Sequence, residues 1–502
     1  MTEASSSRGL IKSMLVIGSA QVVNILISIV RMKVLAVLLG PSGVGLLSIY
    51  NSLLDMVQQT AGLGMGSSGV REIASSRGDE ATLSRVRRVL FAAHLLQGTL
   101  AMLAVWLLRD RIAIWLFGGA EQATEVGLIG IAILLSLLAC AQTALLQGLR
   151  KIGDLGRVTV LGAFFGTLAG LAAVWLQGES GLIWFILVQP LAVVLIALHY
   201  TRHLPIPAAV RLSLFETWNV WKPMAKLGVA FMLGGLATVA TLLIIRAHIA
   251  QELGLDAAGH FAAAWGITMT YVGFILVAMG AEYYPRLTEV INDKVAAVQL
   301  MNDQAQLGLA ISGPVFLLLI GLAPWVITFI YSAKFDPAVP LLQWLMVGNV
   351  FKFVGSVLGF SIVAAGRAKT FLFVELSFNI VFLVMVFVFM PHVGLEVTAY
   401  AFVLGYLLHM CMVYLVARRI LSFRWQSFSF SLLALHTSLG VALLMLALMA
   451  PLAAAIASPL LAAATWLFGL RIVLSKVGKY GRLPTRLYGI FARLGWPIQS
   501  AV

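Results

Sequence analysis

The chain has 502 residues, of which 61% are hydrophobic and only 11% charged, and its mean hydropathy is +0.99. This composition excludes a water-soluble globular protein and predicts an integral membrane protein. The net charge of +14 would suit a nucleic-acid partner. However, most of the basic residues gather on one side of the predicted membrane, so we expect no nucleic acid.

Apolar runs of about 20 residues, the length that crosses a bilayer, follow one another along the chain. Fourteen can be marked, at 10 to 38, 44 to 70, 88 to 108, 124 to 147, 158 to 177, 182 to 201, 226 to 250, 258 to 282, 304 to 331, 340 to 364, 370 to 391, 396 to 417, 428 to 450 and 453 to 474. The sequence therefore predicts an all-α polytopic membrane protein with about 14 transmembrane helices.

The basic residues predict the orientation of these helices. A cytoplasmic N-terminus places 27 of the 34 Lys and Arg on the cytoplasmic side, as the positive-inside rule requires, so we expect both termini in the cytoplasm. The first run is too long for the apolar core of a signal peptide and is expected to remain as a helix. Cys140 and Cys411 fall inside predicted helices, and no disulfide is expected.

Short motifs recur between the two halves of the chain. Residues 39–45 recur at 253–259, 115–117 at 329–331 and 148–151 at 366–369, with offsets of 214, 214 and 218 residues. Because the repeat spans an even number of helices, both copies enter the membrane from the same side. A parallel repeat of two six-helix bundles around a central cavity is the expected architecture.

The repeat sets the expected domain boundaries. The linker between the halves carries prolines among aromatic residues and is typical of a short interfacial helix, and the tail is typical of a basic amphipathic helix on an anionic inner leaflet. We expect an N-terminal bundle at 1–201, a cytoplasmic linker at 202–225, a C-terminal bundle at 226–417, an extra helix pair at 418–474 and a basic cytoplasmic tail at 475–502.

Polar side chains follow one face of three predicted helices. A single Asn or Ser in a membrane helix usually bonds to a neighbouring helix, but stripes this long are unsuited to lipid and predict a hydrated cavity that binds substrate. The stripes comprise Gln21, Asn24, Ser28 and Arg31 in the first helix, Asn51, Asp55 and Gln58 in the second, and Asn349, Lys352 and Ser356 in the tenth.

Three cations lie well inside the predicted spans, namely Arg31, Arg246 and Lys352. A cation in hydrocarbon costs roughly 2.5 to 3.5 kcal/mol, which calls for an anionic partner. Guanidinium groups match phosphate oxygens in a bidentate fork, so these residues are predicted to bind a diphosphate. The alternative for Arg31 and Arg246 is that they reach the membrane interface, because each lies near a helix end.

Asp55 and His94 are the candidates for ion coupling. Asp55 can neutralise a nearby cation or couple transport to ions, and His94 can titrate, hydrogen-bond a sugar or simply bond to a neighbouring helix. The chain contains no D-x-D, H-E-x-x-H or P-loop motif, so we expect no catalytic residue, metal or cofactor.

The segment L-A-V-L-L-G-P-S-G-V-G-L-L-S-I-Y-N at 35–51, with G-M-G-S-S-G-V-R-E-I-A at 64–74, resembles the polysaccharide (Wzx-type, O-antigen) flippases of the multidrug/oligosaccharidyl-lipid/polysaccharide (MOP) superfamily. Many members have twelve helices, so the fourteen predicted here depart from that pattern and are also similar to the lipid II flippase branch.

This resemblance implies a flippase that moves an undecaprenyl-diphosphate-linked oligosaccharide, an O-antigen or related surface polysaccharide unit, across a bacterial inner membrane by alternating access. It implies membrane lipids, a polysaccharide polymerase and a chain-length regulator as partners. The alternatives are a lipid II flippase of peptidoglycan synthesis and, in another class, a membrane-embedded glycosyltransferase, polymerase or ligase acting on the same lipid-linked glycan.

Overall fold

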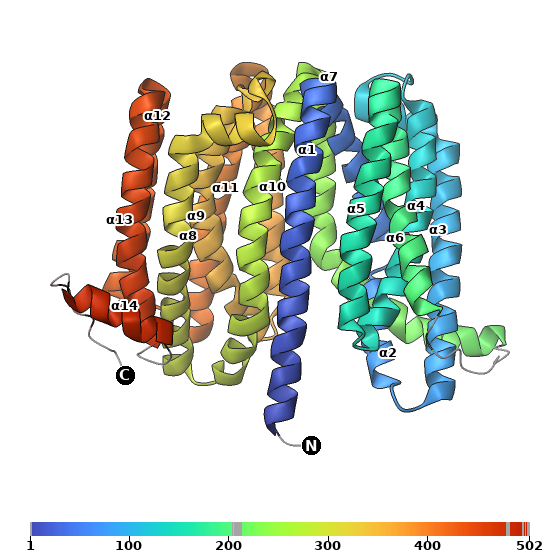
Figure 1. The fold of residues 1–502 in the computed structure, drawn as a ribbon, viewed down its shortest axis with the longest axis horizontal. Helices are drawn as coiled ribbons and strands as arrows, with labels where there is room; N and C mark the ends of the chain where they lie inside the picture. Colours follow the sequence, from blue (N-terminus) through green and yellow to red (C-terminus); the bar gives the residue numbers. More distant parts are fainter. Residues whose placement is uncertain are drawn as a thin grey trace. The chain divides into compact units, whose positions relative to one another are not determined.

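The computed structural model describes residues 3–202, 204, 213–477, 482–493, 496 and 498, and every regular element among them is helical (Figure 1). The elements in chain order are α1 (Glu3–Ala61), α2 (Met65–Ser75), α3 (Glu80–Phe117), α4 (Ala123–Gly148), α5 (Ile152–Gln177), η1 (Gly178–Ser180), α6 (Gly181–Thr201), α7 (Leu214–Val290), α8 (Lys294–Ile330), η2 (Ala333–Phe335), α9 (Ala338–Ala364), α10 (Ala368–Val393), η3 (Gly394–Glu396), α11 (Val397–Leu421), α12 (Ser427–Met449), α13 (Pro451–Val477) and α14 (Arg482–Arg493).

Ten helical stretches in the described part of the chain are long and apolar enough to cross a membrane. Four of these stretches each overlap two of the fourteen predicted runs, namely Gly18–Ala61, Ile152–Thr201, Phe231–Thr270 and Ala368–Leu421. The ten stretches therefore account for all fourteen runs, and the predicted all-α, multi-pass fold is confirmed.

Two of the longest elements, α1 and α7, are each a pair of helices joined at a glycine. Gly40 has φ 69° and ψ −165°, and Gly254 has φ 86° and ψ 171°. Only glycine adopts this backbone conformation without strain. Because the two glycines occupy matching positions of the repeat, the repeated motif specifies the same kink twice.

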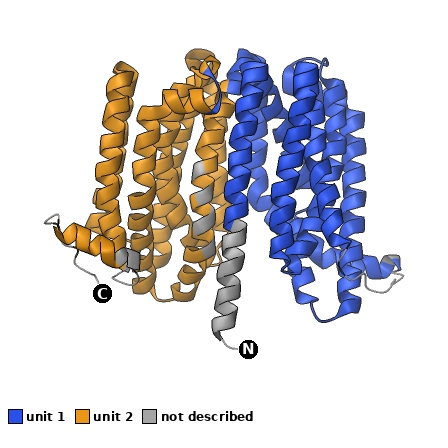
Figure 2. Ribbon diagram, in the orientation of Figure 1, with its two compact units in different colours: residues 1–259, 330–332 blue, residues 260–329, 333–502 orange. Residues whose placement is uncertain are grey.

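The chain divides into two compact units (Figure 2). Unit 1 comprises residues 1–259 and 330–332, and unit 2 comprises 260–329 and 333–502. The division falls shortly after the kink at Gly254, so the first part of α7 belongs to unit 1. The domain boundaries predicted above rest on the sequence repeat, whereas these two units rest on contacts within the structure. The predicted domain boundaries therefore stay a prediction.

Within unit 1, the chain that follows the Gly40 kink of α1 approaches α7 closely at two places, one directly after the Gly254 kink and one in the first helix of α7. A Cβ on Gly45 would lie 2.2 Å from the Leu255 carbonyl oxygen, and one on Gly259 would lie 2.0 Å from that of Pro41. Near the other end, a Cβ on Gly64 would lie 2.0 Å from the Gly228 oxygen. Small residues are what allow membrane helices to pack backbone to backbone.

The other helices of unit 1 form a bundle in which α3 packs on α4, α5 on α6, and α4 on α6 (Figure 1). Asp79 caps α3 by accepting hydrogen bonds from the backbone N–H groups of Ala81 and Thr82 at 3.0 and 3.1 Å. The Thr82 hydroxyl also donates to this carboxylate and, with the backbone bonds, holds the pKa of Asp79 below its usual value.

In unit 2, the extra pair α12 and α13 packs closely against α8. A Cβ on Gly313 would lie 2.1 Å from the His436 ring, and one on Gly321 would lie 2.2 Å from the Ser458 hydroxyl. Gln306 of α8 donates to the Gln426 side-chain oxygen at 3.0 Å and to the Ser429 hydroxyl at 2.8 Å. The pair is thus joined to α8 both by close packing and by buried hydrogen bonds.

The predicted tail helix is present as α14. Tyr488 and Phe491 are buried and pack with Leu474 of α13, and the Tyr488 hydroxyl donates to the Leu474 carbonyl at 2.8 Å. Arg486 and Ile490 are exposed, so α14 has one face bound to unit 2 and one face free of it.

The contact between the two glycine kinks predicts a specific loss of stability. Gly259→Ala should destabilise the protein by about 1 to 3 kcal/mol, because the new methyl group would overlap backbone. Gly234→Ala is the matched control on α7, since a Cβ there meets nothing within 4 Å, and it should be neutral or slightly stabilising. Thermal unfolding of the two purified variants in detergent measures both changes in stability. Equal unfolding midpoints for the two variants would contradict the close contact at Gly259.

Candidate functional site

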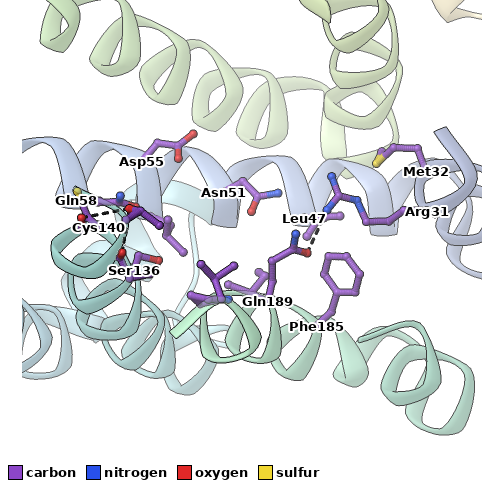
Figure 3. A pocket seen from close by; sticks show the side chains of 16 residues that line it. Arg31, Met32, Leu47, Asn51, Asp55, Gln58, Ser136, Cys140, Phe185 and Gln189 are labelled. Atoms are coloured by element: carbon purple, nitrogen blue, oxygen red, sulfur yellow. Dashed lines mark hydrogen bonds between the residues drawn. The ribbon is translucent and has the colours of Figure 1, made fainter. Parts of the chain in front are cut away.

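A cavity of about 680 Å³ lies within unit 1, between α1, α4 and α6 (Figure 3). Four residues of the predicted stripes line it. Arg31 comes from the first helix of α1, and Asn51, Asp55 and Gln58 come from the second. One member of the first stripe and the three members of the second thus border one cavity, and their role in binding stays a prediction.

Arg31 is held beside this cavity by polar side chains. Its guanidinium donates to the Gln189 side-chain oxygen at 3.0 Å and to the Ser28 hydroxyl at 2.8 Å. It also lies 5.9 Å from the centre of the Phe185 ring, within reach of a cation–π contact. These contacts hold the charge against the bundle, which favours the cavity role of Arg31 over an interfacial one.

A second cavity, of about 290 Å³, adjoins the first. Asp55, Gln58 and Cys140 line both cavities, and the second adds Gln59, Ser67 and His94. The two cavities therefore form one polar region, which has Arg31 on its first part and His94 on its second.

Arg246 has different surroundings from Arg31, although the repeat places them alike. It is half-buried and donates to the Ser48 carbonyl at 3.0 Å and to the Ser52 hydroxyl, both on α1. It does not line either of the two cavities described here. Asp55 is close enough for the two opposite charges to interact. Arg246 thus links α7 to α1 beside the cavity wall.

Lys352 lies in unit 2, on α9. Its Nζ atom lies 3.1 Å from the Met269 sulfur and 5.2 Å from the centre of the Tyr406 ring, and the charge of Glu375 acts on it. The other two members of this stripe also have internal surroundings. Asn349 is fully buried, and the Ser356 hydroxyl donates to the Lys352 carbonyl at 2.8 Å. The contacts of this stripe favour helix packing.

The remaining predicted residues lie at the edge of the site. Gln21 is exposed and Asn24 is partly buried, and neither lines the two cavities described here. His94 is fully buried on α3 and lines the second cavity only.

Sequence reasoning missed the part of the site that α4 and α6 provide. Ser136, Cys140 and Thr143 share one face of α4, and Gln189 of α6 orients Arg31. A signal for Gln189 was present, because a glutamine directly before Pro190 interrupts the apolar run at 182–201. Serine and threonine give a weaker signal, since their hydroxyls can bond to their own helix, as Thr143 does.

Comparison with known proteins places this geometry in a family. Residues 34–340 match the family model described as "Polysaccharide biosynthesis protein". The chain is 24% identical over 395 residues to the lipid III flippases of Escherichia coli (strain K12) and Shigella flexneri, covering 77% of this chain and 94% of each relative.

Two solved structures share the fold. The lipid II flippase MurJ in an inward closed conformation matches with a TM-score of 0.64 and 12% identity, over 92% of this chain and 99% of that one. An inward-facing multidrug resistance MATE family transporter of the MOP superfamily matches with a TM-score of 0.63 and 15% identity, over 80% and 94%. Since the family model spans more than half of the chain, this protein belongs to the polysaccharide biosynthesis protein family, and its fold is similar to those of MurJ and of this MATE transporter.

Proposed function

We propose that this protein is a flippase that moves an undecaprenyl-diphosphate-linked oligosaccharide from the cytoplasmic to the periplasmic leaflet of a bacterial inner membrane. The observation that carries this proposal is the 680 Å³ cavity in which Arg31 lies among the polar side chains Asn51, Gln58 and Gln189. The name of the curated relatives, lipid III flippase, supports it.

The cavity suits the physical task of such a protein. A diphosphate and its sugars must pass about 30 Å of hydrocarbon while the polyprenyl tail stays in lipid. Arg31 offers phosphate the charge-assisted hydrogen bonds that water would otherwise supply, and the amides offer hydrogen bonds to sugar. With the interior negative, outward movement of each negative charge gains about 2.3 kcal/mol per 100 mV. The membrane potential therefore favours export.

Arg31 is the proposed first contact for the diphosphate. Arg246 and Lys352 are proposed as further contacts, each of which exchanges its present protein partners for phosphate oxygens in another state of an alternating-access cycle. The proposed cargo is an O-antigen or related surface polysaccharide unit, and the proposed partners are a polysaccharide polymerase and a chain-length regulator. A second candidate cargo is lipid III, which the name of the curated relatives favours.

Transport by reconstituted protein tests the function and the role of Arg31 together. Arg31→Ala should slow transfer of a labelled lipid-linked oligosaccharide between the leaflets of proteoliposomes by at least about 30-fold, because losing one partner of a buried charge pair costs about 2 to 5 kcal/mol. Lys33→Ala is the matched control. It also removes one positive charge, two residues further along the same helix, but the Lys33 side chain does not line the cavity.

If Arg31→Ala transferred the lipid at the parental rate, the role assigned to Arg31 would be wrong. If the parent protein itself transferred no lipid, the proposed flippase function would be wrong. Formation or cleavage of a glycosidic bond in the same vesicles would favour the glycosyltransferase class instead. Parallel assays with an O-antigen unit and with lipid III distinguish the two cargoes.

Cys140 provides a direct measure of cavity occupancy. The chain has 2 cysteines, and Cys140 lines both cavities whereas Cys411 does not. In a Cys411→Ser background, a small thiol-reactive probe should label Cys140, and lipid-linked oligosaccharide should slow this labelling in a concentration-dependent way. The matched background Cys140→Ser measures labelling of Cys411, which the same lipid should leave unchanged. Equal labelling of Cys140 with and without the lipid would mean that the cargo does not enter this cavity.

The different surroundings of the two arginines predict different effects on stability. Arg246→Ala should lower the free energy of unfolding by about 1.5 to 3 kcal/mol, because it removes a charged donor that bonds to Ser48 and Ser52. Arg31→Ala should cost less, since its guanidinium borders a cavity. Thermal unfolding without ligand compares the stability of the two variants. Adding Asp55→Asn to Arg246→Ala should restore part of the lost stability. A larger loss for Arg31→Ala would contradict this difference.

A further inference from the structure

We propose that the second cavity is a glycan-binding subsite in which His94 and Asp55 accept hydrogen bonds from sugar hydroxyl groups. This inference rests on the proposed function and adds the way in which the cargo is oriented and selected.

His94 lines this cavity, and one of its two ring nitrogens has no hydrogen-bond partner among the described residues. Its side chain is 0% exposed, and its Nδ1 atom lies 2.8 Å from the Leu90 carbonyl oxygen. A carbonyl oxygen can only accept, so Nδ1 carries the proton, and Nε2 of the neutral ring is left as an acceptor. Within the described part of the chain, Nε2 has no hydrogen-bond partner. Because an unpartnered polar atom is costly to bury, this nitrogen points to a ligand that donates.

Two neighbouring side chains add acceptors of the same kind. Asp55 lines both cavities, and its side-chain oxygens can accept hydrogen bonds. The Gln59 amide donates to the Met232 carbonyl at 3.3 Å, and its side-chain oxygen can accept a further hydrogen bond. Asp55 and Gln58 line both cavities, whereas Arg31 lines only the first and His94 only the second.

This difference orients the cargo. A diphosphate has only acceptor oxygens at neutral pH and suits the Arg31 guanidinium, whereas a sugar ring carries several hydroxyl donors that suit the His94 nitrogen and the Asp55 oxygens. The diphosphate therefore lies at Arg31 and the first sugar at His94 and Asp55. A cavity of about 290 Å³ is of the size of the smallest ligand pockets, roughly 300 Å³. Sites that bond to a substrate hydroxyl discriminate strongly against cargo lacking it, so this subsite selects the sugar next to the diphosphate.

Two ligands separate the subsite from the diphosphate site. Binding of undecaprenyl-diphosphate-linked oligosaccharide and of undecaprenyl diphosphate without sugar is measured on purified protein in nanodiscs. His94→Phe keeps the ring shape and removes the acceptor, and it should weaken binding of the glycan-bearing lipid about 10-fold, as expected for one lost hydrogen bond, while the sugar-free lipid binds as to the parent. His94→Gln keeps an acceptor and should restore most of the affinity. His199→Phe is the control, because His199 is exposed and outside both cavities.

Arg31→Ala should weaken binding of both lipids, which marks it as the diphosphate contact. The subsite is wrong if His94→Phe binds the glycan-bearing lipid like the parent, or if it loses both lipids equally. Should His94→Phe fail to fold, Asp55→Ala, which removes both side-chain acceptors, replaces it and must show the same selective loss. Failure of the parent protein to bind either lipid would instead overturn the proposed function.

Discussion

The hydrocarbon core of a membrane provides no water, so every polar group inside the bilayer must find its partner within the protein or in a hydrated cavity. This constraint explains the surroundings of the three cations that the sequence places inside predicted spans, namely Arg31, Arg246 and Lys352. Arg31 bonds to Ser28 and Gln189 beside a cavity, Arg246 bonds to α1, and Lys352 lies against a methionine and a tyrosine in unit 2. Of these three, Arg31 lines one of the two cavities described and Arg246 and Lys352 line neither, which is why the proposed function depends mainly on Arg31.

The close packing of α1 and α7 positions this site. Glycines at both ends of the contact bring the two backbones together, and Arg246 joins the same helices between those ends. Since Asp55 and Gln58 project from this part of α1, the packing fixes where the cavity wall stands. A polar wall held by backbone contacts is pre-organised and does not need its cargo to assemble it.

Much of the fold was predictable because membrane helices can be recognised in the sequence by their length and hydropathy. The repeated Leu-Gly motif also marks the same kink twice. The polar stripes of α1 also predicted four of the sixteen residues that line the first cavity. The partners of Arg31 and Arg246 could not be predicted, since equivalent positions in a diverged repeat have different neighbours. Gln189 bonds to Arg31 from 158 residues away, and nothing local in the sequence links the two. The surroundings of Lys352, which contacts Met269 and Tyr406, likewise come from other helices and could not be derived from its own helix.

The close fit of α12 and α13 on α8 has a consequence for the evolution of the fold. Loss of this helix pair would turn the clefts at Gly313 and Gly321 toward lipid and leave Asn302 and Gln306 without the partners they now have at the start of α12. A twelve-helix descendant would need larger, apolar residues at all four positions. The sequence of α8 therefore records whether a homologue keeps the additional pair, even when the C-terminal region itself has diverged beyond recognition.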